Sequence, residues 1–222
     1  MISSWLSIAL VTFIGIFPIA NPFSTTVVFL TITEGFSEDR RKQQARLACI
    51  YMAVILITFL LLGTLIMNFF GISIPGLRIA GGLIVTGIGF GMLSPKSDND
   101  TPKGSAQHGA LKKDVAFTPL AMPMLSGPGS IAVTIGMATD ANGIGENLAI
   151  VVGIGLVAFV SWLVLRASTR VVRFLGQSGM TAMGRIMGFL LVCVGIQFIV
   201  DGAHDFLSSP AFWAPILDAI RG

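Results

Sequence analysis

Long apolar stretches alternate with short polar segments along this chain. The stretch at residues 47–67, LACIYMAVILITFLLLGTLIM, contains no charged side chain. A run of about 18 or more apolar residues is long enough to cross the roughly 30 Å hydrocarbon core of a membrane as a helix. Six segments of this kind follow one another, at residues 5–33, 47–67, 77–93, 115–139, 147–165 and 184–200. The pattern predicts an all-α integral membrane protein with six transmembrane helices.

The composition points in the same direction. Of the 222 residues, 54% are hydrophobic and 11% are charged, whereas an average soluble domain has about 25% charged residues. The pI near 9.2 would be typical of a nucleic-acid-binding protein if the chain were soluble. Here the basic residues have a topological explanation, so the lipid bilayer is an expected partner and nucleic acid is not.

The Lys and Arg residues are distributed unevenly between the two predicted sides of the membrane. Twelve of the fourteen lie in or beside the segments that follow the first, third and fifth predicted helices, and only Arg78 and Arg221 lie on the other side. Because cytoplasmic loops carry the excess of Lys and Arg, both termini are expected on the non-cytoplasmic side. The first ten residues, MISSWLSIAL, have no basic residue, so we expect no removable signal peptide.

The two halves of the chain resemble each other. PIANP at residues 18–22 aligns with PLAMP at residues 119–123, with both prolines and the alanine matched. Later in each half, Arg78-Ile79 is followed by Gly, Leu and Val at the same spacing as after Arg185-Ile186. Since each half has three helices, an odd number, the second half must enter the membrane from the opposite side. The sequence therefore predicts two three-helix repeats with inverted topology, an architecture that recurs in secondary transporters.

These observations predict four parts of the chain. Residues 1–93 form the first three-helix repeat, and residues 114–200 form the second, inverted one. Residues 94–113 are polar and rich in Gly and Ser, which is typical of a flexible linker and here of a cytoplasmic one. Residues 201–222 form a C-terminal tail that is expected to lie in the membrane interface, anchored by Trp213.

The first and fourth predicted helices contain prolines and glycines that should interrupt them. Proline removes a backbone donor, and unpaired backbone groups survive in a membrane only when they are buried in protein or line a wet cavity. Matching breaks in two inverted halves indicate a substrate site. Free N–H groups after a break suit a carboxylate and free carbonyls suit an ammonium group or a cation, so a zwitterionic amino acid would use both. The candidate substrate-binding residues are Pro18, Ala20, Asn21, Pro22, Ser24, Thr25, Pro119, Pro123, Ser126, Gly127, Pro128, Gly129 and Ser130.

Other kinds of chemistry find less support in the sequence. Ser126 and Ser130 beside glycines resemble the setting of a nucleophile, but the two histidines, His108 and His204, lie outside the predicted spans. The two cysteines lie in separate apolar segments and lack the further partners that a metal site needs. We therefore expect neither an enzyme nor a cofactor or metal site.

The coupling ion is left open by the sequence. All eleven acidic residues lie in loops or at the ends of the predicted spans, with Asp114 and Asp201 nearest to the membrane. A buried carboxylate that could relay protons is therefore missing from the span interiors. A cation bound by backbone carbonyls, uncoupled export, and titration of Asp114 or Asp201 remain as alternatives.

Three longer motifs carry a resemblance to a known family. FGISIPGLRIAGGLIVTGIGF at residues 70–90, PLAMPMLSGPGSIA at 119–132 and RIMGFLLVCVGIQFI at 185–199 resemble the MarC family of integral membrane proteins. The resemblance covers the chain except for the linker and the tail. It implies a six-span protein of the bacterial inner membrane, related to small neutral amino acid transporters and more distantly to the lysine exporter superfamily. Many members of that family have Asp-Pro where this chain has Asn21-Pro22, which implies a difference in substrate or coupling.

Together these patterns predict a secondary transporter of small neutral amino acids of the glycine or alanine type. It would work by alternating access around a mid-membrane site between the two breaks, with a proton or a sodium ion as the candidate coupling ion. The alternatives are export of another small metabolite or a drug, a channel, and a membrane scaffold without transport activity. The direction of transport, the stoichiometry, the oligomeric state and any role in antibiotic resistance are not determined by the sequence.

Overall fold

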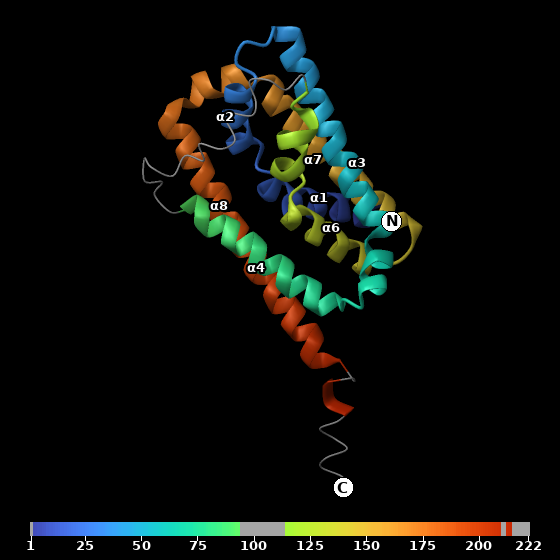
Figure 1. Ribbon diagram of the computed structural model, residues 1–222. Coiled ribbons are helices and arrows are strands. Elements are labelled where there is room, and N and C mark those ends of the chain that lie inside the picture. Colours follow the sequence, from blue (N-terminus) through green and yellow to red (C-terminus); the bar gives the residue numbers. More distant parts are fainter. Residues whose placement is uncertain (1, 94–113, 210–211, 215–222) are drawn as a thin grey trace.

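The structure is a computed structural model that describes residues 2–93, 114–209 and 212–214. The predicted linker at residues 94–113 and ten of the 22 residues of the predicted tail, 210–211 and 215–222, lie outside the described residues. Within them the regular structure is helical, and no strand occurs (Figure 1). The elements are α1 (Ile2–Ala20), α2 (Pro22–Ile32), α3 (Glu38–Phe70), α4 (Ile74–Leu93), η1 (Ala116–Leu125), α6 (Pro128–Asp140), α7 (Ile144–Arg166) and α8 (Ser168–Ser208).

Four of these helices are long and apolar enough to cross a membrane, namely α3, α4, α7 and the Ser178–Ser208 part of α8. The pair α1 and α2 is bent by 42° at its break, and it makes a fifth candidate if the two helices form one span. The fourth predicted helix, at residues 115–139, instead consists of η1 and α6, which have 10 and 13 residues. Neither is long enough to cross alone, so the described residues provide four or five such helices rather than six unbroken ones.

Two helices extend further than the apolar pattern predicts. The basic residues between 40 and 46 were expected in a connecting segment, but they lie in α3, which begins at Glu38. The Ser37 hydroxyl accepts a hydrogen bond from the Arg40 N–H and caps this helix start. Similarly, α8 begins at Ser168, changes direction at Gly176 where φ is +65°, and continues to Ser208. Long basic side chains favour the helical conformation as much as leucine does, so the polar segments lengthen the helices.

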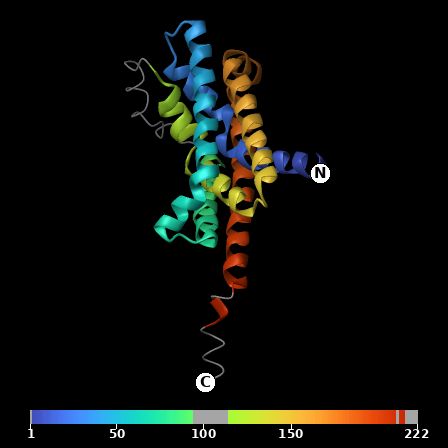
Figure 2. The ribbon, with the colours of Figure 1, turned by 90° about the vertical axis from the view of Figure 1, so that its right-hand side faces the viewer.

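Helix α3 shows how an apolar segment is divided between the protein interior and its surroundings. Its buried positions recur every three or four residues, as expected for one face of a helix. They include Ala48, Met52, Leu56, Leu60 and Gly63. Large apolar side chains on other faces, such as Val54 and Leu65, are exposed, which suits contact with lipid. Figure 2 shows α3, α7 and the end of α8 running along the length of the molecule, with α1 crossing them at a steep angle.

Helix α4 lies against α8 over most of the length of α4 (Figure 1). A Cβ atom placed on Gly82 would lie 2.5 Å from the carbonyl oxygen of Gly195, and one on Gly89 would lie 2.7 Å from that of Gly188. Since the later residue of α4 faces the earlier residue of α8, the two helices run antiparallel. Their backbones approach closely because glycine has no side chain, as in many membrane helix pairs.

The short helix α6 lies among several longer helices. Its residues Ala132, Ile135 and Met137 are the nearest neighbours of glycines in α4, α3 and α1, respectively. On another side, the Phe198 ring of α8 lies near Gly136. These contacts place the segment that follows the second predicted break inside the helix bundle.

Candidate functional site

The first predicted break is present at Asn21, between α1 and α2. Asn21 has φ 39° and ψ 65°, a left-handed conformation that is uncommon for residues other than glycine but that asparagine tolerates best. Its N–H donates to the Phe17 carbonyl at 3.0 Å, and its own carbonyl accepts from the Thr25 N–H at 3.1 Å. One residue therefore ends α1 and caps α2.

The Asn21 side chain is used by the protein itself. Its Oδ1 accepts from the Ser24 N–H at 3.3 Å, and its Nδ2 donates to the Ser24 hydroxyl at 2.9 Å. The same Nδ2 lies 3.5 Å from the Met92 sulfur of α4. With 6% of its surface exposed, Asn21 is a buried N-cap whose amide already has partners on both ends.

The hydroxyl groups that follow this break also bond within their own helix. Thr25 donates to the Asn21 carbonyl at 3.1 Å, and Thr26 donates to the Pro22 carbonyl at 2.7 Å. Both side chains are buried. Bonds of this type, to the carbonyl four residues earlier, satisfy a buried hydroxyl without a ligand.

The second predicted break is longer than the first and begins inside η1. Thr118 and Met122 have extended conformations, with φ near −125° and ψ near 122°. Each precedes a proline, Pro119 and Pro123, and the residue before a proline is driven out of the helical region by steric contact with the ring. In the predicted repeat, Met122 is the counterpart of Asn21, so both positions interrupt a helix.

The break is completed at Ser126 and Gly127, after which α6 begins at Pro128. The N–H and the hydroxyl of Ser126 both donate to the Ala121 carbonyl, at 2.9 and 2.8 Å. Gly127 is extended and has no side chain with which to cap the helix. The N–H groups of Gly129 and Ser130 have no hydrogen-bond acceptor among the described residues. Ser130 is fully buried, so α6 starts with two unpaired donors inside the protein.

The end of α1 has unpaired backbone acceptors, whereas the start of α6 has unpaired donors. The carbonyl of Pro18 would normally accept from residue 22, but Pro22 has no N–H. The Ala20 carbonyl would accept from the Ser24 N–H, which instead bonds to the Asn21 side chain. In the described part of the chain, the carbonyls of Pro18, Ile19 and Ala20 accept no hydrogen bond. Helix α1 therefore ends with unpaired acceptors.

These two helix ends lie close together. A Cβ atom on Gly129 would lie 3.3 Å from the Ile19 side chain of α1 and 2.9 Å from the Val85 side chain of α4. The acceptor end of α1 and the donor end of α6 thus meet beside α4. The site is closed, because Asn21, Ser126 and Ser130 are all buried.

The predicted site residues are only partly brought together. Pro18, Ala20 and Pro22 are buried near the first break, and Pro119 is half-buried in η1. The side chain of Pro123 is outside what the structure describes. Ser24 is exposed and faces Gly184 of α8, with 3.7 Å between its hydroxyl and a Cβ at that glycine. Residues on either side of Gly184 line a pocket of about 500 Å³ along α8.

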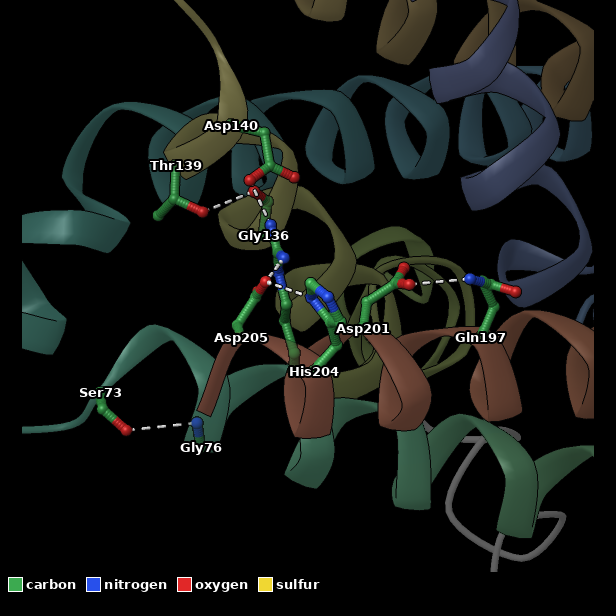
Figure 3. Close-up of polar contacts among 10 residues, drawn as sticks. Ser73, Gly76, Gly136, Thr139, Asp140, Gln197, Asp201, His204 and Asp205 are labelled. Carbon is green, nitrogen blue, oxygen red and sulfur yellow. Dashed lines mark hydrogen bonds and ion pairs between the residues drawn. The ribbon is translucent and has the colours of Figure 1, made fainter. Parts of the chain in front are cut away.

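A charged cluster away from the breaks was not predicted. The Arg78 guanidinium of α4 forms ion pairs with Asp140, the last residue of α6, and with Asp205, near the end of α8. Figure 3 shows the carboxylates of Asp140 and Asp205 turned toward the same centre from two different elements. The sequence contained a signal, since Arg78 is the first of the two basic residues on its predicted side of the membrane and several acidic residues share that side.

The two aspartates considered for ion coupling have local partners. Asp114 accepts a hydrogen bond from the Ala116 N–H at 2.9 Å, and Asp201 accepts from the Gln197 side chain at 2.8 Å (Figure 3). Among the described residues, no group of three or more His, Cys, Asp or Glu side chains could hold a metal ion.

Comparisons with known proteins agree on one family. The sequence profile of the MarC family integral membrane proteins matches residues 6–207. The UPF0056 inner membrane protein MarC of Salmonella typhimurium (strain LT2) is 39% identical over 203 residues, which cover 86% of this chain and 92% of the relative. The protein of the same name from Escherichia coli O1:K1 / APEC has the same identity and coverage. No solved structure matches the chain.

Proposed function

This chain belongs to the MarC family of integral membrane proteins, and we propose that it is a secondary transporter of small neutral amino acids of the glycine or alanine type. The relatives are named inner membrane proteins, which is the membrane we propose for this chain as well. The substrate would bind between the end of α1 and the start of α6.

One observation carries the proposal, namely that an acceptor end and a donor end of two interrupted helices meet inside the protein. The unpaired N–H groups of Gly129 and Ser130 suit a carboxylate, and the helix dipole of α6 adds a partial positive charge there. The unpaired carbonyls at the end of α1 suit an ammonium group. An amino acid zwitterion presents these two charges on neighbouring carbon atoms.

The tight packing around the site supports a small substrate. Val85 and Ile19 lie so close to Gly129 that even a methyl group on this residue would meet them. The site therefore has to open before it can bind, and a glycine or alanine molecule requires the smallest opening. This is the behaviour expected of a carrier that alternates between closed and open states.

The proposed architecture is two inverted three-helix repeats with both termini on the non-cytoplasmic side. It is supported by the antiparallel contact of α4 with α8, the third helices of the two halves, and by the helix interruptions at Asn21 and Met122. The Lys and Arg distribution supports the orientation. Since no carboxylate is buried among the described residues, the unpaired carbonyls of α1 are the proposed position for a coupling cation.

The proposal makes the chain a carrier and not an enzyme. The hydroxyls of Ser126 and Ser130 donate to the carbonyls of Ala121 and Leu125, at 2.8 and 3.5 Å, rather than to a side-chain base. A serine nucleophile needs a base within hydrogen-bond distance of its hydroxyl.

Counterflow in proteoliposomes tests the function. Purified protein is reconstituted into vesicles preloaded with unlabelled glycine or alanine, and uptake of the labelled amino acid is followed with and without proton and sodium gradients. Saturable counterflow is the expected result, and dependence on one gradient identifies the coupling ion. Linear, unsaturable flux would mean a channel, and no flux through folded, reconstituted protein would contradict the amino acid substrate.

A further inference from the structure

The Arg78 cluster joins three elements that are distant in the sequence. Arg78 lies one turn into α4, and its two terminal nitrogens contact Asp140 of α6 and Asp205 of α8. The Arg78 side chain is only 12% exposed, whereas Asp140 and Asp205 retain more contact with the surroundings. A planar guanidinium that holds two carboxylates at once is a strong link between helices, because each hydrogen bond is charge-assisted.

Helix α6 connects this cluster directly to the proposed substrate site. Its first turn contains the unpaired N–H groups of Gly129 and Ser130, and its last residue is Asp140. A helix of 13 residues is about 20 Å long and moves as one piece. A shift of α6 that opens its N-terminal end to a substrate would therefore also move Asp140 relative to Arg78.

The opposite end of the molecule is held by contacts of a different kind. The Arg41 side chain of α3 donates to the Thr33 carbonyl at the end of α2, at 3.3 Å. There the ion pairs connect Lys42 with Glu38 and Asp39, all within the first turns of α3. Arg185, the predicted repeat counterpart of Arg78, is exposed and forms no ion pair with a carboxylate of the described chain. The Arg78 cluster differs from these contacts because its guanidinium pairs with two carboxylates that come from two other helices.

We propose that Arg78, Asp140 and Asp205 form a latch that closes one end of the transport pathway and must separate before the site opens on that side. The Lys and Arg distribution predicts that this is the non-cytoplasmic side. The inference rests on the proposed function, since it assigns the latch to the same transport cycle. Among neighbouring charged groups, the His204 ring lies 3.8 Å from Asp205 and adds to the cluster when protonated.

The latch is tested by the access of a water-soluble thiol reagent to the buried site, a measurement that needs no substrate. The probe is Ser130→Cys in the full chain with Cys49→Ala and Cys193→Ala. A membrane-impermeant maleimide is added to intact cells and, separately, to inside-out vesicles. The latch variants are Asp140→Asn with Asp205→Asn, and Arg78→Lys, which keeps the charge but not the forked donor.

Breaking the latch is expected to raise the labelling rate of the Ser130→Cys probe from the outside of intact cells about tenfold, because the closed state loses charge-assisted hydrogen bonds. The exchange of Arg78→Asp with Asp205→Arg keeps one cation between two carboxylates and should restore protection. Gln44→Leu is the matched control. It removes a buried side-chain link at the other end of the molecule, the bond from the Val115 N–H at 2.9 Å.

The outcomes separate the latch from the substrate assignment. Faster outside labelling in the latch variants, protection by the charge exchange and no change in the control would support the latch, whatever the counterflow assay shows. Unchanged labelling in both latch variants would overturn it, and so would equally fast labelling in Gln44→Leu or faster labelling only from the cytoplasmic face. The proposed function fails separately, if glycine and alanine give no counterflow.

Discussion

The two helix breaks begin with the same motif, Pro-x-Ala-x-Pro, but they differ in how they treat the freed backbone groups. At the first break, the Asn21 side chain supplies the partner that the α2 start lacks, so the N-terminal end of α2 is capped. At the second break, the helix begins Gly127-Pro128-Gly129, and no side chain is available to cap it. The first break therefore leaves only the acceptors at the end of α1 unpaired, whereas the second leaves donors at the start of α6 that a ligand could use. A proline motif predicts the interruption, but the residues around it decide whether the interruption can bind a ligand.

The largest effect is expected for Gly129→Leu at the second break. The added side chain would meet Val85 and Ile19, and overpacking of this kind costs about 1–3 kcal/mol of stability. Because it also fills the proposed substrate position, counterflow should fall to the level of empty vesicles. Gly155→Leu in α7 is the matched control, because no neighbouring atom of the described residues lies within 4 Å of a Cβ atom placed on Gly155. Equal transport by the two variants would contradict the placement of the site at Gly129.

A smaller effect of a different kind is expected for Asn21→Ala at the first break. Alanine loses the cap and is strained in the left-handed conformation, which together cost about 2 kcal/mol. Asn21→Gly should lose less, because glycine adopts this conformation without strain. Thermal unfolding in detergent measures the loss, and KM for counterflow should stay unchanged in both variants. A higher KM at unchanged stability would mean that the amide binds substrate.

A third substitution tests whether the first break determines the coupling ion. Asn21→Asp introduces the residue found in the Asp-Pro motif of many proteins that the chain resembles, and a carboxylate can still accept from the Ser24 N–H. It also adds a titratable group inside the protein. We expect transport to become dependent on the proton gradient, measured as uptake of labelled glycine with and without an imposed pH difference. Identical gradient dependence in both proteins would remove position 21 from the coupling mechanism.

The smallest effect is expected for Ser126→Ala. The hydroxyl shares the Ala121 carbonyl with the Ser126 N–H, so alanine leaves that carbonyl paired. Loss of one such hydrogen bond costs about 1 kcal/mol. Thermal unfolding should show this small change, and KM for glycine should change by less than about threefold, which corresponds to less than one hydrogen bond. A larger KM increase at unchanged stability would place the Ser126 hydroxyl in contact with the substrate.

The sequence by itself determined the membrane class, the family and the positions of the two interruptions. These depend on local properties, since apolar length sets a span and a proline excludes the helical conformation of the residue before it. The motif at residues 119–123 is one example, because it predicts extended residues that the structure has at Thr118 and Met122. Helix ends were predicted less well. The basic residues after Ser37 and Ala167 lie in the first turns of α3 and α8, which therefore begin earlier than the apolar pattern alone predicts.

Only the tertiary structure decided which of the freed backbone groups found partners and which residues met across the bundle. Asn21 could have faced a ligand, but its amide bonds to Ser24 and lies against Met92, which is 71 residues away. Arg78 similarly pairs with carboxylates from two other helices. The spacing of residues along the chain does not predict such contacts. The physical reason is that backbone preferences act over a few residues, whereas hydrogen bonds and ion pairs between helices depend on how the whole bundle packs.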